Sequence, residues 1–410
     1  MEKLYGNAAV GQSGGPTAAI NATLSGVIRG ALAAAEKGVI HKIYGMRNGI
    51  EGLCEQRLVD LGKIFTDKQT FSDLEHTPAA ALGACRKKLP PPERDDPVYA
   101  CILDVFKKYD IRYFFYIGGN DSMDTVMKLR VYTDRVGYAM RIIGVPKTID
   151  NDLEGTDHTP GFGSAAKYIA TSVKEILCDC AVYTVGAVTI TEIMGRDAGW
   201  LTAAAALPRL SGGRAPDYVY LPERVFDMRN FFADIRAALA VHPDVVIAVS
   251  EGVRFADGTY VCEGIAKKVD AFGHTQLSGT GNALCMAIRE EIGCKTRAVE
   301  FNTPQRCASH IASAADLRES VAIGRKAVEF ALRGVSGHMM TFVRSQTGYK
   351  ITVGSVDVNE VANKVRRVPD DFITPAGNNV TDKCLDYLRP LIEGQVRYRT
   401  ACGMPVHFIL

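Results

Sequence analysis

The chain has 410 residues, 48 of them Lys or Arg and 46 Asp or Glu, which gives a formal net charge of +2. This balance excludes a bulk electrostatic attraction to nucleic acid or to an anionic membrane. Apolar residues make up 47% of the sequence, but no apolar run approaches the roughly 18 residues that a membrane span needs. A first strand starts almost at Met1 and leaves no room for a signal peptide, so we expect a cytoplasmic protein of enzyme size.

Strand-like and helix-like segments alternate along the chain, without internal repeats. The strands are expected at 5–10, 39–44, 113–117, 141–145, 182–191, 217–221, 244–250, 296–301 and 338–344. The helices are expected at 17–35, 97–108, 123–136, 161–180, 228–240, 279–292, 318–333 and 382–392, and 48–52 is expected to be a loop. The alternation predicts a doubly wound α/β protein, with two lobes and a site between them.

A small-residue turn follows the first strand and opens the first helix. Gly14 and Gly15 would let a phosphate approach the backbone amides and the helix N-terminus. The same turn could serve only to reverse the chain. Further on, the loop 77–86 ends in Arg86, which either lies on a solvated basic surface or contacts a phosphate.

The segment 113–117 is a buried strand that runs into Gly118 and Gly119. Asn120 and Asp121 follow, and both residue types cap helices. A strand, a glycine turn and a helix N-terminus commonly bind phosphate, whereas the carboxylate of Asp121 repels an anion. The turn therefore either binds no phosphate or excludes one by charge, and a plain capping role for Asp121 is the structural alternative.

Charged residues crowd the ends of three later strands. Lys147, Thr148, Asp150 and Asp152 follow 141–145, at the edge where open α/β sheets bind their ligands. Asn and Asp also suit a surface turn, which is the alternative. Arg196 and Glu251 also follow strands, and Arg306 lies in a later loop. For Arg196, a salt bridge at a helix start is the structural alternative.

Taken together, these ordered motifs resemble the phosphofructokinase family over most of the chain. The motifs are Gln12–Pro16, Gly118–Ser122, Pro146–Asp152, Met194–Arg196, Glu251 and Gln305–Arg306. The resemblance implies transfer of a phosphoryl group to the 1-hydroxyl of fructose 6-phosphate, with Mg²⁺. It also implies two Rossmann-like lobes with the active site in the cleft between them. Residues 1–160 and about 305–355 would form the donor lobe, 161–304 the sugar-phosphate lobe, and 356–410 a C-terminal helical tail.

Position by position, the resemblance assigns roles to single residues. Asp150 resembles the base that takes the hydroxyl proton, with Asp152 as its acidic neighbour. Asn120 stands where the family's Mg²⁺-linked acid is usual. The expected contacts to the sugar phosphate or the moving phosphoryl group are Thr148, Met194, Gly195, Arg196, Glu251, Arg297, Thr303 and Arg306. The expected contacts to the donor phosphates are Gly14, Gly15, Arg86 and Gly119.

Two positions bear on the phosphoryl donor. The family's ATP-using members have glycine at the positions of Asp121 and Lys147, and its pyrophosphate-using members have aspartate and lysine, as here. A carboxylate at Asp121 would repel an α-phosphate, and Lys147 would neutralise the leaving phosphate. The resemblance therefore implies pyrophosphate as the donor and a reaction that runs in both glycolytic and gluconeogenic directions. ATP is the alternative.

The chain also departs from the family pattern. Asn120 replaces the usual aspartate, Ala187 replaces an arginine that is often present, and Thr303 replaces a histidine found in many ATP-using members. Arg297 and Arg306 resemble residues of which one normally serves a neighbouring subunit, so a homodimer or homotetramer is expected. A non-catalytic metabolite sensor would not need Lys147, Asp150 and Arg196 together.

The eleven cysteines are scattered without a C-x-x-C pair, and the closest spacing is Cys178-Asp-Cys180. This spacing favours reduced, structural thiols over a zinc or redox centre.

Overall fold

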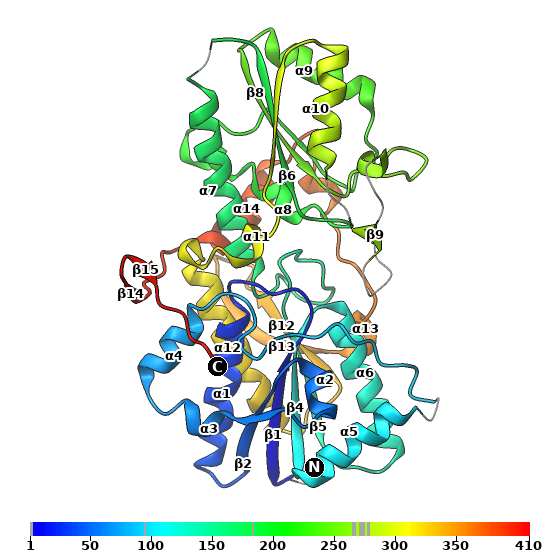
Figure 1. Cartoon of the computed structure of the whole chain (residues 1–410), viewed down its shortest axis with the longest axis vertical. Helices are drawn as coiled ribbons and strands as arrows, with labels where there is room; N and C mark the ends of the chain where they lie inside the picture. Colours follow the sequence, from blue (N-terminus) through cyan, green and yellow to red (C-terminus); the bar gives the residue numbers. More distant parts are fainter. Residues whose placement is uncertain (1–2, 94–95, 183, 265–267, 270–274, 277–278) are drawn as a thin grey trace.

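Two sheets of different size organise the computed structural model, which describes residues 3–410 except 94–95, 183, 265–267, 270–274 and 277–278. The larger sheet forms the first lobe and the smaller sheet the second, one above the other in Figure 1. Both sheets carry helices, so the predicted α/β architecture of two lobes is confirmed.

The sheet of the first lobe has the strand order β13-β12-β5-β4-β1-β2-β3. β1, β4 and β5 lie at its centre, run parallel and are almost wholly buried, as expected for strands covered on both faces. The edge strands β3 and β13 are antiparallel to their neighbours. The strands are β1 Gly6–Gln12, β2 Ile40–Met46, β3 Leu58–Asp60, β4 Ile111–Gly118, β5 Arg141–Pro146, β12 His338–Arg344 and β13 Ile351–Asp357.

Helices cover both faces of this sheet. They are α1 Ile20–Ala35, α2 Gly49–Cys54, α3 Leu61–Ile64, α4 Lys68–Glu75, α5 Pro97–Lys108, α6 Asn120–Arg135, α12 Ala314–Leu332 and α13 Val358–Val361. α1 and α12 pack closely because glycines lie where they cross. A Cβ on Gly26 would come within 2.1 Å of the Val321 carbonyl oxygen, and one on Gly324 within 2.2 Å of the Thr23 carbonyl oxygen.

The second lobe has a parallel four-stranded sheet in the order β11-β6-β8-β7. Its strands are β6 Ala187–Ile193, β7 Tyr218–Tyr220, β8 Asp244–Ser250 and β11 Lys295–Glu300. Its helices are α7 Phe162–Cys180, α8 Trp200–Ala204, α9 Met228–Leu239, α10 Thr280–Glu291 and α11 Pro304–Cys307, with short 3-10 turns at Leu207–Ser211, Val261–Gly264 and Ser309–Ile311. β9 Lys268–Val269 pairs with β10 Thr275–Gln276 in a separate small ladder.

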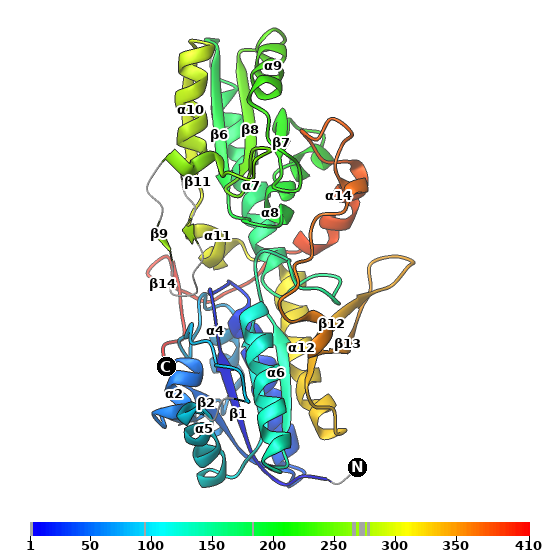
Figure 2. The same cartoon turned by 90° about the vertical axis from the view of Figure 1, so that its right-hand side faces the viewer.

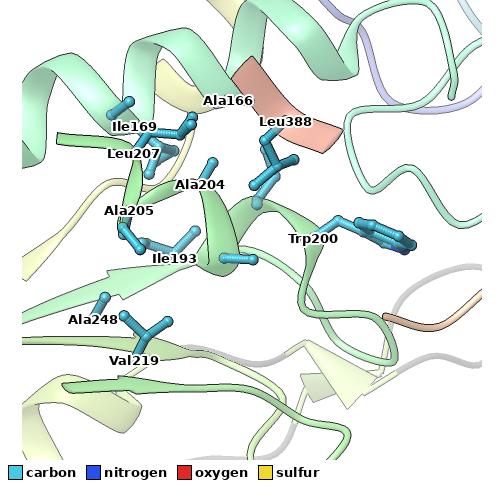
Figure 3. Packing of buried hydrophobic residues seen from close by; sticks show 14 of the residues in the cluster. Ala166, Ile169, Ile193, Trp200, Ala204, Ala205, Leu207, Val219, Ala248 and Leu388 are labelled. Atoms are coloured by element: carbon cyan, nitrogen blue, oxygen red, sulfur yellow. The ribbon is translucent and has the colours of Figure 1, made fainter. Parts of the chain in front are cut away.

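The C-terminal segment contacts both lobes. Its elements are the 3-10 turn Asp370–Phe372, α14 Asp382–Leu388, the 3-10 turn Arg389–Ile392, β14 Thr400–Ala401 and β15 Met404–Pro405. α14 packs into the core of the second lobe, where Figure 3 shows Leu388 and Trp200 among the buried side chains. The chain then returns to the first lobe (Figure 1), where Arg399 pairs with Asp73 at 2.5 Å and the ring of Phe408 lies 5.2 Å from that of Phe65.

Several expectations about elements were wrong. Residues 48–52 are not a loop, because α2 starts at Gly49 after a left-handed Asn48 with φ 60°. The segment after β13, expected to be a helical tail, contains a small hairpin as well as helices. The strand predicted at 182–191 starts only at Ala187. Among the described residues, no helix combines the length and apolar character that a membrane crossing requires.

Candidate active site

A cavity of about 510 Å³ lies between the lobes and is lined from both of them. Figure 2 shows the same two lobes from the side, with β1 and α6 in the lower lobe and β6 and β8 in the upper one. The carboxyl ends of parallel strands point to this junction, which is where open α/β sheets bind ligands. The predicted site residues on its wall are Gly14, Gly15, Arg86, Gly119, Asn120, Asp121, Lys147, Thr148, Asp150, Asp152, Met194, Arg196, Glu251 and Arg306.

The turn after β1 receives the side chain of Lys147. The Lys147 ammonium donates a hydrogen bond of 2.5 Å to the carbonyl oxygen of Gly15. Gly14 has φ 74°, and a Cβ there would lie 3.4 Å from the Lys147 Nζ, so glycine leaves this space open. The backbone of Lys147 donates to the carbonyl of Gly118, which ties the turns after β4 and β5 together.

Lys147 is buried, and this burial lowers its pKa to about 8, even though the carboxylate of Asp150 acts in the opposite direction. An amine with a pKa near the working pH carries a positive charge when protonated and loses that charge when its proton passes to solution. The side chain therefore places a titratable positive charge directly on the Gly14–Gly15 turn.

The loop after β5 holds two carboxylates on the cavity wall. Burial raises the pKa of Asp150, against the opposing effect of Lys147 and Arg196. Burial and the neighbouring Asp150 raise the pKa of Asp152 to about 7. The backbone N–H of Asp150 donates 3.0 Å to the hydroxyl of Thr148, which fixes the turn locally. Two close carboxyl groups with raised pKa values favour proton exchange with a ligand.

The start of α6 presents Asn120 and Asp121 to the cavity. The amide oxygen of Asn120 is buried and has no hydrogen-bond partner within the described structure. Such an atom normally has a partner, so it is suited to a ligand or a metal ion. Asp121 forms an ion pair with Lys88, at 3.2 Å between the Lys88 Nζ and a carboxylate oxygen, and both side chains are more than a third exposed.

On the second-lobe side, Glu251 follows β8 and accepts a hydrogen bond of 3.3 Å from the backbone N–H of Gly195. Burial raises the pKa of Glu251 to about 8. The backbone N–H of Met194 donates 3.0 Å to the side-chain oxygen of Gln305, which links the turn after β6 to α11. α11 also carries Arg306, whose guanidinium would come within 3.3 Å of a Cβ on Gly15.

Two predicted sugar-phosphate residues lie away from this cavity. Arg297 is on β11 and pairs with Asp179 at 3.1 Å, on the wall of a separate cavity at the opposite end of the second-lobe sheet. Thr303 is exposed at the start of α11. The structure therefore brings the residues named above to one cavity wall, and Gly195, although not on the wall, is bonded to Glu251 there. Within one chain it separates Arg297 and Thr303 from them.

The sequence analysis missed several residues of the cavity wall. Lys88 follows Arg86 without a predicted role, yet it pairs with Asp121. Asn363 and Val365 reach the cavity from the C-terminal segment, where no local motif marks them. Asp197 lines the cavity beside Arg196 and pairs with Arg254 at 2.7 Å. Among the described residues, no group of three or more His, Cys, Asp or Glu side chains is placed to hold a metal ion.

Comparisons with known proteins agree with this geometry. The family model described as phosphofructokinase matches residues 7–331. The pyrophosphate–fructose 6-phosphate 1-phosphotransferase of Halomonas elongata is 41% identical over 394 residues, which cover 95% of this chain and 92% of that protein. The enzyme of the same name from Methylococcus capsulatus is 39% identical over 407 residues, covering 98% and 96%.

The same likeness extends to solved structures. The crystal structure of the pyrophosphate-dependent phosphofructokinase from Nitrosospira multiformis has a TM-score of 0.88 and 38% identity, and the match covers 98% of this chain and 96% of that one. Family model, sequence relatives and fold agree, and the chain belongs to the phosphofructokinase family.

Proposed function

We propose that this protein transfers a phosphoryl group reversibly from pyrophosphate to the 1-hydroxyl of fructose 6-phosphate, giving fructose 1,6-bisphosphate and phosphate. The observation that carries the proposal is the pair of charged residues at the donor turns, Lys147 on the Gly14–Gly15 turn and Asp121 at the start of α6. The names of the relatives from Halomonas elongata and Methylococcus capsulatus support the same donor and acceptor. We further propose that the enzyme works in the cytoplasm, as expected from its sequence.

The donor site favours a short, highly charged ligand. Lys147 and Arg86 supply positive charge for phosphate oxygens, while the carboxylate of Asp121 opposes a longer polyphosphate. The ion pair with Lys88 weakens this repulsion only in part, since exposed pairs interact weakly in water. Pyrophosphate needs no space for a nucleoside and would avoid Asp121.

In the proposed reaction, Asp150 accepts the proton of the 1-hydroxyl while the hydroxyl oxygen attacks the nearer phosphorus of pyrophosphate. A new P–O bond forms to the sugar, the bridging P–O bond breaks, and the electron pair leaves with inorganic phosphate. Lys147 stabilises the charge that accumulates on this leaving group. Arg196 and Arg306, on the opposing wall, hold the phosphoryl group and the sugar phosphate.

The residues present fit a magnesium ion at the start of α6. The buried, unpartnered amide oxygen of Asn120 faces the cavity, and Mg²⁺ in proteins takes few protein oxygens together with substrate phosphates and water. When bound, Mg²⁺ would neutralise charge on the donor phosphates. Asn120 would contribute a neutral ligand, so most of the ion's charge compensation would come from the pyrophosphate itself.

We also propose that the sugar-phosphate site is completed by a second copy of the chain. Arg297 lies outside the cavity of its own chain, and it can exchange its exposed partner Asp179 for a phosphate. A homodimer or homotetramer would bring Arg297 of one copy to the cleft of another.

The experiment that tests the proposal is a comparison of donors. The purified protein is assayed with fructose 6-phosphate and Mg²⁺, with either pyrophosphate or ATP, and in reverse with fructose 1,6-bisphosphate and phosphate. We expect kcat/KM for pyrophosphate to exceed that for ATP by at least about a hundredfold, and the reverse reaction to proceed. Efficient turnover with ATP alone would refute pyrophosphate as the donor, and absence of both activities would refute the phosphotransferase.

A further inference from the structure

The C-terminal segment lies against the loop that carries Asp150 and Asp152. The backbone N–H of Arg366 donates a hydrogen bond of 2.8 Å to the carbonyl oxygen of Asp152. The carbonyl oxygen of Arg366 in turn accepts 3.0 Å from the indole N–H of Trp200, which follows the turn after β6. One residue of the tail therefore joins a site loop of the first lobe to a site loop of the second.

Asn151, between the two carboxylates, is the most constrained residue of this loop. It is completely buried and has φ 55°, a left-handed conformation that is uncommon outside glycine. Its side-chain oxygen accepts 3.1 Å from the backbone N–H of Thr159, and its side-chain amide donates 3.0 Å to the hydroxyl of Tyr387 on α14. Asn151 thus holds an unusual backbone conformation through partners on both sides.

The hydroxyl of Tyr387 uses its whole hydrogen-bonding capacity on this loop and its neighbour Arg366. It accepts from Asn151 and, at 3.2 Å, from Arg366, and it donates 2.6 Å to the carbonyl oxygen of Asp157. One donated and two accepted bonds are all that a tyrosine hydroxyl can form. It therefore bridges the two ends of the segment 151–157, of which Asp152 is a part.

The ring of Tyr387 is fixed as firmly as its hydroxyl. Its centroid lies 5.2 Å from that of Trp200 and 5.6 Å from that of Phe372, and the guanidinium of Arg344 lies 4.4 Å above it. A tyrosine with locked ring and hydroxyl can hold a loop within the small tolerance that a reacting geometry requires.

The same tail also supports the turn that contains Met194 and Arg196. One carboxylate oxygen of Glu223 accepts 2.9 Å from the backbone N–H of Gly199 and 2.9 Å from that of Val368. The tail is therefore attached to the site loops of both lobes.

From these contacts we infer that Tyr387 is a positioning residue for the reaction: through Asn151 and Asp157 it holds the Asp150–Asp152 carboxylates in their reacting geometry. The inference rests on the proposed function in one respect, since Asp150 must be the group that takes the hydroxyl proton. Tyr387 itself does not line the cavity, so it would act through the loop and not on the substrate.

The test is Tyr387→Phe, which keeps the ring and removes the three hydrogen bonds. The matched control is Tyr113→Phe in β4, which also removes a buried hydroxyl bonded to a backbone carbonyl, that of Leu4 at 2.7 Å, but at the strand end away from the cavity. We expect Tyr387→Phe to lower kcat about tenfold, with KM for both substrates within about twofold of wild type. The control should keep kcat within about twofold.

A second measurement needs no turnover. Amide hydrogen exchange of residues 150–159 should accelerate at least about tenfold in Tyr387→Phe and remain unchanged in the control. If wild type turns over pyrophosphate and Tyr387→Phe matches the control in both kcat and exchange, the positioning role is refuted. A rise in KM without a fall in kcat would also refute it. A wild-type enzyme without activity would instead refute the proposed function, whereas the exchange result would still report on the loop.

Discussion

The two halves of the cleft differ in how completely one chain builds them. On the donor side, the turns after β1, β4 and β5 converge within a single sheet, and backbone hydrogen bonds join them to one another. On the sugar side, Glu251 and Met194 are held in place, but Arg297 and Thr303 lie away from the cavity. If the proposed function holds, this difference means that one chain alone would set the donor choice, whereas recognition of the sugar phosphate would depend on assembly.

The largest effect is expected at the residue that serves both halves. Asp150→Ser removes the carboxylate and keeps a small polar group, so kcat should fall at least about a hundredfold while KM for fructose 6-phosphate changes little. Steady-state kinetics, with the melting temperature as a check on folding, measure this. Activity within a few-fold of wild type would rule out Asp150 as the base.

A smaller effect is expected at Arg306, which lies where the two halves meet. Arg306→Ala should raise KM for fructose 6-phosphate by roughly 10- to 150-fold, because a charge-assisted contact is worth about 1.5–3 kcal/mol. The Gly15 turn lies beside Arg306, so KM for pyrophosphate must be measured as well. If the larger increase falls on pyrophosphate, Arg306 belongs to the donor half and the division drawn above is wrong there.

Assembly of the sugar half can be tested by combining a variant weakened in sugar-phosphate binding with the nearly inactive Asp150→Ser. Arg297→Ala should raise KM for fructose 6-phosphate about tenfold if the residue contacts the 6-phosphate. When Arg297→Ala is mixed with Asp150→Ser and the subunits exchange, the activity should exceed the sum of the activities of the two variants alone. The reason is that hybrid assemblies contain a site with Asp150 from one copy and Arg297 from the other.

No recovery in demonstrably hybrid assemblies would place Arg297 outside a neighbour's site. A fully active monomer, measured by light scattering at assay concentration, would contradict the assembly itself.

Substitution of Asp121 is expected to shift the preference between ATP and pyrophosphate several-fold. Asp121→Gly removes the charge and opens space, so the ratio of kcat/KM for ATP to that for pyrophosphate should rise about fivefold or more. Asp121→Asn keeps the size and polarity of the side chain and removes the charge, so it should shift the ratio in the same direction. If neither variant changes the ratio, Asp121 has no part in donor choice. The alternative of a helix cap is wrong, because Gly119 is the N-cap of α6 and Asp121 lies within the first turn.

The smallest effect concerns pH. Burial lowers the pKa of Lys147 to about 8, so the free enzyme loses this positive charge as the pH rises through that value. kcat/KM for pyrophosphate should therefore be about half its plateau near pH 8 and decline further above it, because this quantity reports free-enzyme groups. Lys147→Met should lack this decline, and an unchanged pH profile in that variant would assign it to another group.

Much of the fold followed from local patterns. Buried strands such as 244–250 and 338–344 were predicted to the residue, because continuous apolar runs between helices specify parallel core strands. The family expected from the motifs is confirmed. α2 was missed because Asn48 and Gly49 both have positive φ, which is typical of a turn. β13 was missed because it is an edge strand, only partly buried along its length.

For the site, the limit lay in sequence distance. Lys147, Thr148, Asp150 and Asp152 follow one strand, so a single motif predicted their common location, which the structure shows. Asn363 and Tyr387 belong to the C-terminal segment, whose composition alone suggests only a tail. Their contacts with Asp124 and Asn151 span more than two hundred residues and leave no periodic signal in the sequence. Their roles stay predictions until variants are measured.

The return of the C-terminus to the first lobe has a consequence for synthesis of the protein. Phe408 and Leu410 pack on the core that β1 and α1 begin, and β12 completes the sheet beside β5 only after the sheet of the second lobe has been made. The first half to leave the ribosome is therefore the last to be finished, whereas the second lobe has its sheet within one continuous stretch. A nascent chain stalled before residue 338 would expose the edge of β5 and part of an apolar core, a state that invites mispairing and chaperone capture.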